Sequence, residues 1–230
     1  MSAVTVRATK IEPKARRPKG KQTRLTILDS VLNIIAREGT RGVTHRAVAA
    51  EADVQLSLTT YYFADIDTMI REAFAHFSHQ ARPDIEQLWK EIFNCVDQYS
   101  AAQLRKVAVR EALCEQLTNL TTQYIVTQIV NKPVGLAVEQ VFFTHTRLSN
   151  ELRLMGTEHR AQLIEPIVTL CARFNSADPE VDAELLLNSI TTLEYQALAI
   201  AREEVDRDRL RRLLARQIGW IMGLKRAGSS

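Results

Sequence analysis

Apolar residues recur at helical spacing along most of this chain, and the pattern predicts an all-α fold. The first clear stripe runs from about residue 22 to residue 38 and ends at Gly39, a residue type that commonly terminates helices. Two much shorter helices are predicted next, one capped by Thr44 and one over about residues 56–62, with Val54 in the tight turn between them. Helices this short are stable only against a scaffold, so one can be held while the other projects, as in a helix-turn-helix.

Longer helical stripes fill the rest of the chain, so the pattern predicts nine or ten helices in total. Pro83 is predicted to open a new helix after one over about residues 65–80, and Asp178–Pro179 has the sequence of a cap followed by a first turn. The other helices are predicted over about residues 101–131 with a candidate break at 118–122, from Pro133, over 149–174, from 179 to about 204, and over 206–223.

Composition excludes several classes of protein. With 8 Gly and 6 Pro in 230 residues, the chain has little turn material for a β-rich fold. Its apolar runs are shorter than the ~18 residues that span a bilayer, and residues 1–24 lack the apolar block of a secretory signal peptide. Cys95, Cys114 and Cys171 are far apart and have no metal-ligand or redox spacing, which indicates reduced thiols in a cytoplasmic protein.

Charge is distributed unevenly along the chain. Residues 1–24 hold eight basic residues and one acidic residue, whereas residues 25–230 hold 22 basic and 26 acidic residues. A basic tail ahead of an acidic body is typical of proteins that contact phosphates, and a disordered solubilising tail is the alternative interpretation.

The short helix over residues 56–62 carries the side chains that suit nucleic acid. Hydroxyl groups stand beside short apolar groups there, and this mixture fits base edges, thymine methyls and phosphates. The aromatic run Tyr61-Tyr62-Phe63 is open to a second interpretation as core. We assign Phe63 to the core and Tyr61 to a phosphate contact.

Residues 22–77 resemble the DNA-binding domain of the TetR family of transcription regulators. The resemblance is carried by Arg24–Leu28, by Arg37-Glu38-Gly39, by VTHRAVAAEADV at 43–54 and by TYYFAD at 60–65. Asp53 stands where the family usually has Gly, and Asp65 and Asp67 stand where it often has a phosphate-binding Lys. Together, the residues and the resemblance indicate DNA contacts by Arg16, Arg17, Lys19, Lys21, Arg24, Thr44, His45, Arg46, Gln55, Leu56, Ser57, Leu58, Thr59, Thr60 and Tyr61.

The remaining helices are expected to form a regulatory body. The helix after Pro179 is apolar around most of its circumference, which favours a homodimer, and we place the interface on Leu152, Leu163, Ile167, Leu186, Ile190, Leu193 and Ala197. The resemblance also implies a ligand cavity, for which the candidate residues are Trp89, Phe93, Leu117, Tyr124, Phe142, His145 and Cys171. Few charges fall on inward helix faces, so a hydrophobic or amphipathic ligand is expected.

We therefore expect a basic arm over residues 1–21, disordered in solution, a helix-turn-helix domain over 22–64 and a ligand-binding and dimerisation domain over 65–225. The resemblance implies a repressor that binds a palindromic operator and is released by a small inducer. A DNA-binding protein that acts through a protein partner is the alternative. Catalysis is disfavoured because no motif surrounds Cys114, His145 or His159, and His76 and His79 lack a third metal ligand. No cofactor is expected.

Overall fold

The computed structural model describes residues 18–144, 148–175 and 177–224 and confirms the all-α fold. Within these ranges there are nine α-helices, three short 3₁₀ turns and no strand. The helices are α1 (Pro18–Glu38), α2 (His45–Glu51), α3 (Leu56–Tyr62), α4 (Ile66–Val96), α5 (Val107–Asn131), α6 (Pro133–Thr144), α7 (Asn150–Cys171), α8 (Pro179–Ala197) and α9 (Arg207–Ile221), and the 3₁₀ turns are η1 (Thr40–Gly42), η2 (Gln103–Arg105) and η3 (Arg202–Glu204).

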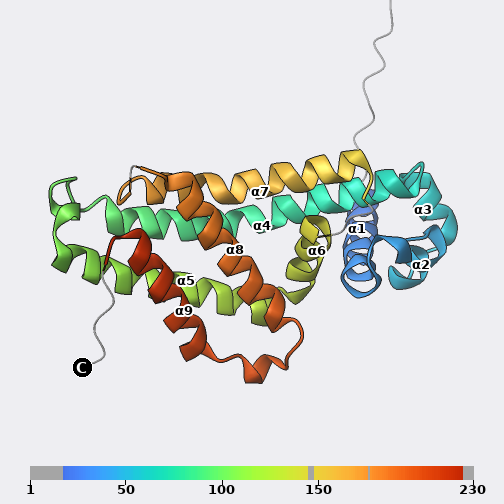
Figure 1. The fold of residues 1–230 in the computed structure, drawn as a ribbon. Coiled ribbons are helices and arrows are strands. Elements are labelled where there is room, and N and C mark those ends of the chain that lie inside the picture. The colour runs from blue at the N-terminus through green and yellow to red at the C-terminus, as the bar shows by residue number, and fades with distance from the viewer. Residues whose placement is uncertain (1–17, 145–147, 176, 225–230) are drawn as a thin grey trace, which may run out of the picture.

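Helices α1 to α3 form a small head at one end of the molecule, and α4 leads from it into a larger helical body (Figure 1). Helix α1 begins at Pro18, earlier than the predicted start near residue 22, because proline is favourable in the first turn of a helix. It ends where predicted, at Glu38, and is followed by Gly39, whose φ of 71° is readily adopted by glycine and whose N–H donates to the Ile35 carbonyl over 2.9 Å.

Helix α4 is a single helix of 31 residues, and the prediction of a new helix at Pro83 is wrong. Proline removes one backbone donor from a helix interior, but the apolar stripe continues on both sides of it. Met69, Phe74 and Phe77 are buried before the proline, and Ile92 and Val96 are buried after it. Tertiary packing along this stripe therefore keeps the helix continuous through Pro83.

Two other predicted boundaries are also wrong. Helix α5 begins at Val107 rather than near residue 101, and its Thr-rich segment 118–122 is unbroken because Thr118 and Thr121 are buried within it. Helix α8 ends at Ala197, before the predicted end near residue 204, and its last turn is followed by η3. None of the described helices is both long enough and apolar enough to cross a lipid bilayer.

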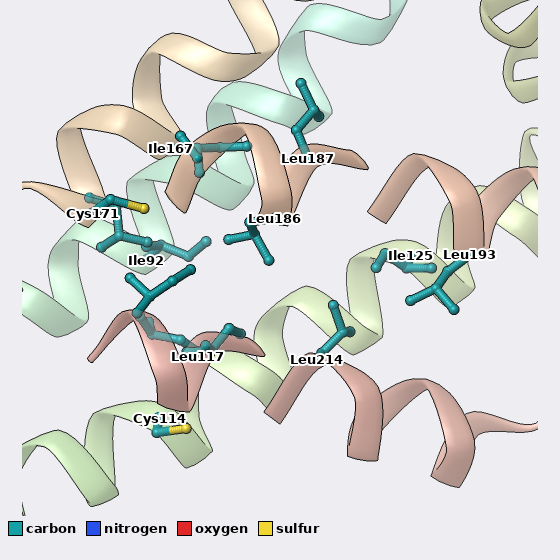
Figure 2. Packing of buried hydrophobic residues seen from close by; sticks show 14 of the residues in the cluster. Ile92, Cys114, Leu117, Ile125, Ile167, Cys171, Leu186, Leu187, Leu193 and Leu214 are labelled. Atoms are coloured by element: carbon teal, nitrogen blue, oxygen red, sulfur yellow. The ribbon is translucent and has the colours of Figure 1, made fainter. Parts of the chain in front are cut away.

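Two apolar clusters hold the chain together. One joins α1 to α3 with the first half of α4 and with α6 and α7, and Phe74 stacks on Phe142 within it at a ring distance of 3.7 Å. The other joins the second half of α4 to α5, α7, α8 and α9 (Figure 2). In that view Ile92, Ile167, Leu186 and Leu117 converge from four different helices. The head thus shares its core with the body through α4, α6 and α7.

Candidate nucleic-acid interface and internal cavity

Local hydrogen bonds build the turn between α2 and α3. The Thr44 hydroxyl accepts from the Ala47 N–H over 3.0 Å and caps α2, as predicted. Asp53 occupies the left-handed region with a φ of 50°, which aspartate tolerates better than most residues. The Val54 N–H then closes the turn onto the Ala49 carbonyl over 3.0 Å. The departure from glycine at Asp53 is therefore compatible with the tight turn.

Helix α3 presents most of its predicted contact face to solvent. It spans the predicted residues, and the Tyr61 side chain is 78% exposed while Leu56 is 47% exposed. Phe63, at its end, is buried as predicted. The other exposed members of the predicted DNA-contact set in this region are Thr44, Arg46, Gln55, Ser57 and Thr60, and Leu58 is half-buried.

Thr59 is fully buried at 0% exposure, so the prediction that it contacts DNA is wrong. Its hydroxyl donates to the Leu56 carbonyl over 2.8 Å, and its Oγ1 lies 3.1 Å from His45 Nδ1. His45 is half-buried by the same contact. The pair links α2 to α3 inside the head.

Arg24 of α1 joins the head to α4 and to the residue that ends α3. Its guanidinium forms an ion pair with Glu72 of α4 and lies 5.2 Å from the centre of the Phe63 ring. Its predicted phosphate contact would compete with this ion pair. Lys21 is exposed on the first turns of α1. Arg16 and Arg17 lie outside the described residues, as does the side chain of Lys19.

The head itself has little positive charge to offer DNA. Arg37 is engaged with Glu38 and Glu51, and the nearby carboxylates raise its pKa. Asp65 caps α4 by accepting from the Thr68 N–H over 2.6 Å, which lowers its pKa and keeps it anionic. The cationic groups that remain exposed on the described helix-turn-helix surface include Arg41 and Arg46.

A cavity of about 430 Å³ lies between the head and the body. Its walls come from α1, α4, α5, α6, α7 and α8, so one wall belongs to the head. Lining residues from α1 and α4 include Asn33 and Gln80, which are exposed, whereas Leu187 and Thr191 of α8 are buried. The exposed lining residues lie on α1, on α4 and at the start of α6, where Lys132 and Val134 are exposed, and they mark the mouth of the cavity, whereas the buried lining residues include those of α8.

Some of the predicted ligand residues line this cavity and others do not. Trp89 and Tyr124 do, whereas Leu117 and Cys171 line a neighbouring cavity of about 40 Å³. Phe142 is committed to the stack with Phe74, and the Phe93 ring packs 5.8 Å from Trp89 without lining either cavity. His145 lies outside the described residues.

The inner end of the cavity carries two buried glutamates that the sequence analysis missed. Glu139 accepts from the Tyr195 hydroxyl over 2.9 Å and from His159 Nε2 over 3.1 Å. Glu194 is only 5% exposed, and burial, reinforced by the Glu139 charge, raises its pKa well above the usual range. A signal was available in the sequence, because each glutamate has apolar residues three and four positions away along its helix.

The predicted dimer residues belong to the interior of the chain. Leu152, Ile167, Leu186, Leu193 and Ala197 are buried in the two apolar clusters, so their assignment to a subunit interface is wrong. Helices α7 and α8 also pack against each other within the chain. The remaining two, Leu163 and Ile190, are half-buried and line the cavity. The exposed faces of the same helices carry other apolar groups, including Leu154, Val181 and Leu185.

Several of the cysteines and histidines that could act in catalysis or metal binding are buried or paired with other side chains. Burial raises the pKa of Cys114, and it raises the pKa of Cys171 to about 12, so both thiols are poor nucleophiles. His159 is bonded to Glu139, and His76 Nε2 lies 3.0 Å from Asp29 Oδ1. Within the ranges that the structure describes, no three His, Cys, Asp or Glu side chains are grouped as metal ligands would be.

Solved structures of transcriptional regulators share this fold. A regulator from Rhodococcus sp. Rha1 gives a TM-score of 0.60 at 15% sequence identity, covering 87% of this chain and 96% of that one. A TetR-family member from Streptomyces coelicolor A3 gives 0.53 at 23% identity, covering 85% and 98%. The multidrug binding protein EbrR, complexed with imidazole, gives 0.53 at 20% identity, covering 90% and 97%. No protein-family model and no curated protein sequence matches the chain. The chain thus has the fold of TetR-family regulators.

Proposed function

We propose that this protein is a TetR-family transcription regulator that binds a palindromic operator as a homodimer and is released by a small molecule. The observation that carries the proposal is the position of the cavity, which has walls from head helix α1 and from five helices of the body. A ligand in this cavity would touch the head and the body at once.

The head supports the DNA-binding part of the proposal. Helix α3 projects Leu56, Thr60 and Tyr61 from a turn whose internal polar groups are already hydrogen-bonded. An exposed helix of this kind fits the major groove, where hydroxyl and apolar groups meet base edges and phosphates. Because the head has few exposed cations, the basic residues before α1 would supply much of the phosphate attraction.

The cavity supports regulation by a ligand. Leu32 and Asn33 of α1 line it together with Phe77 of α4, and α1 also packs on α4 and α6. A ligand that fits one orientation of α1 better than another shifts the equilibrium between head orientations, and its effect is limited to that difference in affinity. A volume of about 430 Å³ suits a drug-sized molecule, which favours a small effector over a purely protein-mediated response.

A twofold interface would use the outer faces of α7 and α8. Val181 and Leu185 stand on one exposed face of α8, and Leu185 is 55% exposed. Exposed apolar groups beside polar ones, on two packed helices, match the composition of a subunit interface. We place the helix-turn-helix domain at 22–64 and the ligand-binding and dimerisation domain at 65–225.

The proposal is tested by an electrophoretic mobility shift with a duplex from the DNA immediately upstream of the coding region. We expect a discrete complex for the wild-type protein and for Val107→Ala, a change at an exposed position on α5, outside the proposed interface and the DNA-contact face. The double variant Thr60→Ala, Tyr61→Ala should lose that complex. Equal binding by all three proteins would refute the assignment of α3 as the DNA-contacting helix.

A further inference from the structure

The cavity has four charged side chains on its walls, and three of them already have a partner. Asp29 pairs with His76, Lys132 forms an ion pair with Asp84, and Glu139 accepts from Tyr195 and His159. Glu194 is the fourth. In the part of the chain that the structure describes, no side chain pairs with the Glu194 carboxyl group or donates a hydrogen bond to it.

An unpartnered carboxyl group at this depth is unfavourable for the fold on its own. Ionising it in an apolar cavity without a countercharge is costly, and the adjacent Glu139 adds repulsion. Burial and the Glu139 charge therefore favour the protonated form of the Glu194 carboxyl group and raise its pKa. A positively charged ligand would supply the missing countercharge and allow the carboxylate to form.

The other walls suit the apolar part of such a ligand. Trp89, Phe77 and Tyr124 present aromatic rings to the cavity, and aromatic faces attract cations. The Tyr124 hydroxyl has no hydrogen-bond partner within the described ranges, and Gln128 also lines this space. The Tyr124 oxygen and the Gln128 amide oxygen, on the walls of the same cavity, can each accept an N–H bond and so favour a ligand that donates N–H bonds.

We propose that the cavity binds a lipophilic organic monocation, such as a protonated aryl or alkyl amine, with its charge on Glu194 and its apolar body directed toward the mouth beside α1. A single positive charge is expected because one carboxyl group lacks a partner. The inference deepens the proposed function, since it names the chemical class of the effector.

Three matched fluorescent probes test the charge preference: aminomethyl-anthracene, hydroxymethyl-anthracene and anthracene carboxylate. Near neutral pH they are cationic, neutral and anionic, and they share one ring system. We expect the amine to bind the wild-type protein about tenfold more tightly than the alcohol, and the carboxylate to bind most weakly. Equal affinity for amine and alcohol would overturn the inference.

Glu194→Gln keeps the shape of the side chain and removes its charge. It should lower the amine's affinity about tenfold and leave the alcohol's affinity almost unchanged. Glu184→Gln is the matched control, because Glu184 lies on the same helix, is exposed and pairs with Arg160 outside the cavity. A loss for both probes in Glu194→Gln, or the same loss in Glu184→Gln, contradicts the assignment. Thermal unfolding establishes that each variant is folded.

Proton release gives a second readout. Amine binding should expel the Glu194 proton, so calorimetric heats should differ between phosphate and Tris buffers for wild type and agree for Glu194→Gln. Tyr124, Glu139, His159 and Tyr195 surround the site, with Asp29, His76, Asp84 and Lys132 at and around the mouth, and all remain in the variant. Proton release that persists in Glu194→Gln would place the charge pairing elsewhere and overturn the assignment.

The outcome separates this inference from the proposed function. A protein that binds its upstream DNA but does not prefer the amine refutes the cation site alone. A protein that prefers the amine through Glu194 but binds no DNA refutes the regulatory function alone.

Discussion

Buried polar groups differ in their hydrogen bonding between the helix-turn-helix head and the part of the body that lines the cavity. In the head, the Thr59 hydroxyl has a partner in the Leu56 carbonyl and another in His45. In the body, the buried Glu194 carboxyl group lines a cavity without a hydrogen-bond partner among the described residues. Buried polar groups are nearly always satisfied in folded proteins. The turn between α2 and α3 is therefore held by internal hydrogen bonds, whereas the cavity presents the Glu194 carboxyl group without one, as the proposed binding of a positively charged ligand requires.

The largest effect is expected where the two regions share their core. Phe74→Ala removes a fully buried ring stacked on Phe142, and it should lower the free energy of unfolding by about 3–5 kcal/mol. Chemical denaturation measures the change, with Val107→Ala on α5 as the exposed control. A loss below about 1 kcal/mol would show that the head does not depend on this cluster.

Glu194→Gln should stabilise the empty protein, and the gain should grow with pH. The folded-state pKa of Glu194 lies above its unfolded value, so its stabilising contribution is complete below the unfolded pKa and is lost as pH rises toward the folded pKa. The difference between variant and wild type should therefore increase by about 1.4 kcal/mol per pH unit across that window. Denaturation at acidic and mildly alkaline pH measures it. A gain that stays constant with pH would contradict an unpaired carboxyl group.

Thr59→Val tests how much the hydrogen bonds of the Thr59 hydroxyl stabilise the head. It keeps the volume of the side chain but removes the hydroxyl bonded to the Leu56 carbonyl, and it leaves His45 without that partner. We expect a loss of about 1–2 kcal/mol in unfolding free energy. DNA binding should weaken only through this loss of order. If instead the variant is fully stable but reads a different DNA sequence, Thr59 contacts bases after all.

Tyr61→Phe should have the smallest effect on the fold and a moderate effect on DNA. The side chain is 78% exposed, so the unfolding free energy should change by less than about 0.5 kcal/mol. Loss of one hydroxyl–phosphate hydrogen bond should weaken binding to specific and random duplexes alike, by about 3- to 10-fold. Fluorescence anisotropy with both duplexes measures this. A loss confined to the specific duplex would reassign Tyr61 to a base contact.

The sequence predicted the head more closely than the body for a physical reason. Helix ends in the head are set by residues that interact with their sequence neighbours, namely Gly39, Thr44 and Asp53. Capping and backbone preferences therefore predict the ends of α1, α2 and α3 to within a few residues. Burial of Thr59 was not predicted because a short polar helix does not reveal which hydroxyl faces its neighbour.

In the body, packing against neighbouring helices determines helix boundaries and buried faces that the sequence periodicity does not determine. Pro83 stays helical because packing outweighs one lost backbone bond. The stripe with Leu186 and Leu193 was assigned to a partner subunit, but α8 buries it within its own chain. Glu139 and Glu194 lie on apolar helix faces. A charged residue on such a face indicates a functional group, and this signal is present in the sequence.

Selection of duplexes from a random pool by the purified protein tests the central claim most directly. We expect enrichment of one inverted repeat, with half-sites in successive major grooves, because two copies of α3 related by a twofold axis would each contact one half-site. Tyr61→Ala combined with Thr60→Ala should abolish the enrichment. A pool that stays random with wild-type protein, or an enriched site without symmetry, would contradict the claim that paired copies of α3 read DNA.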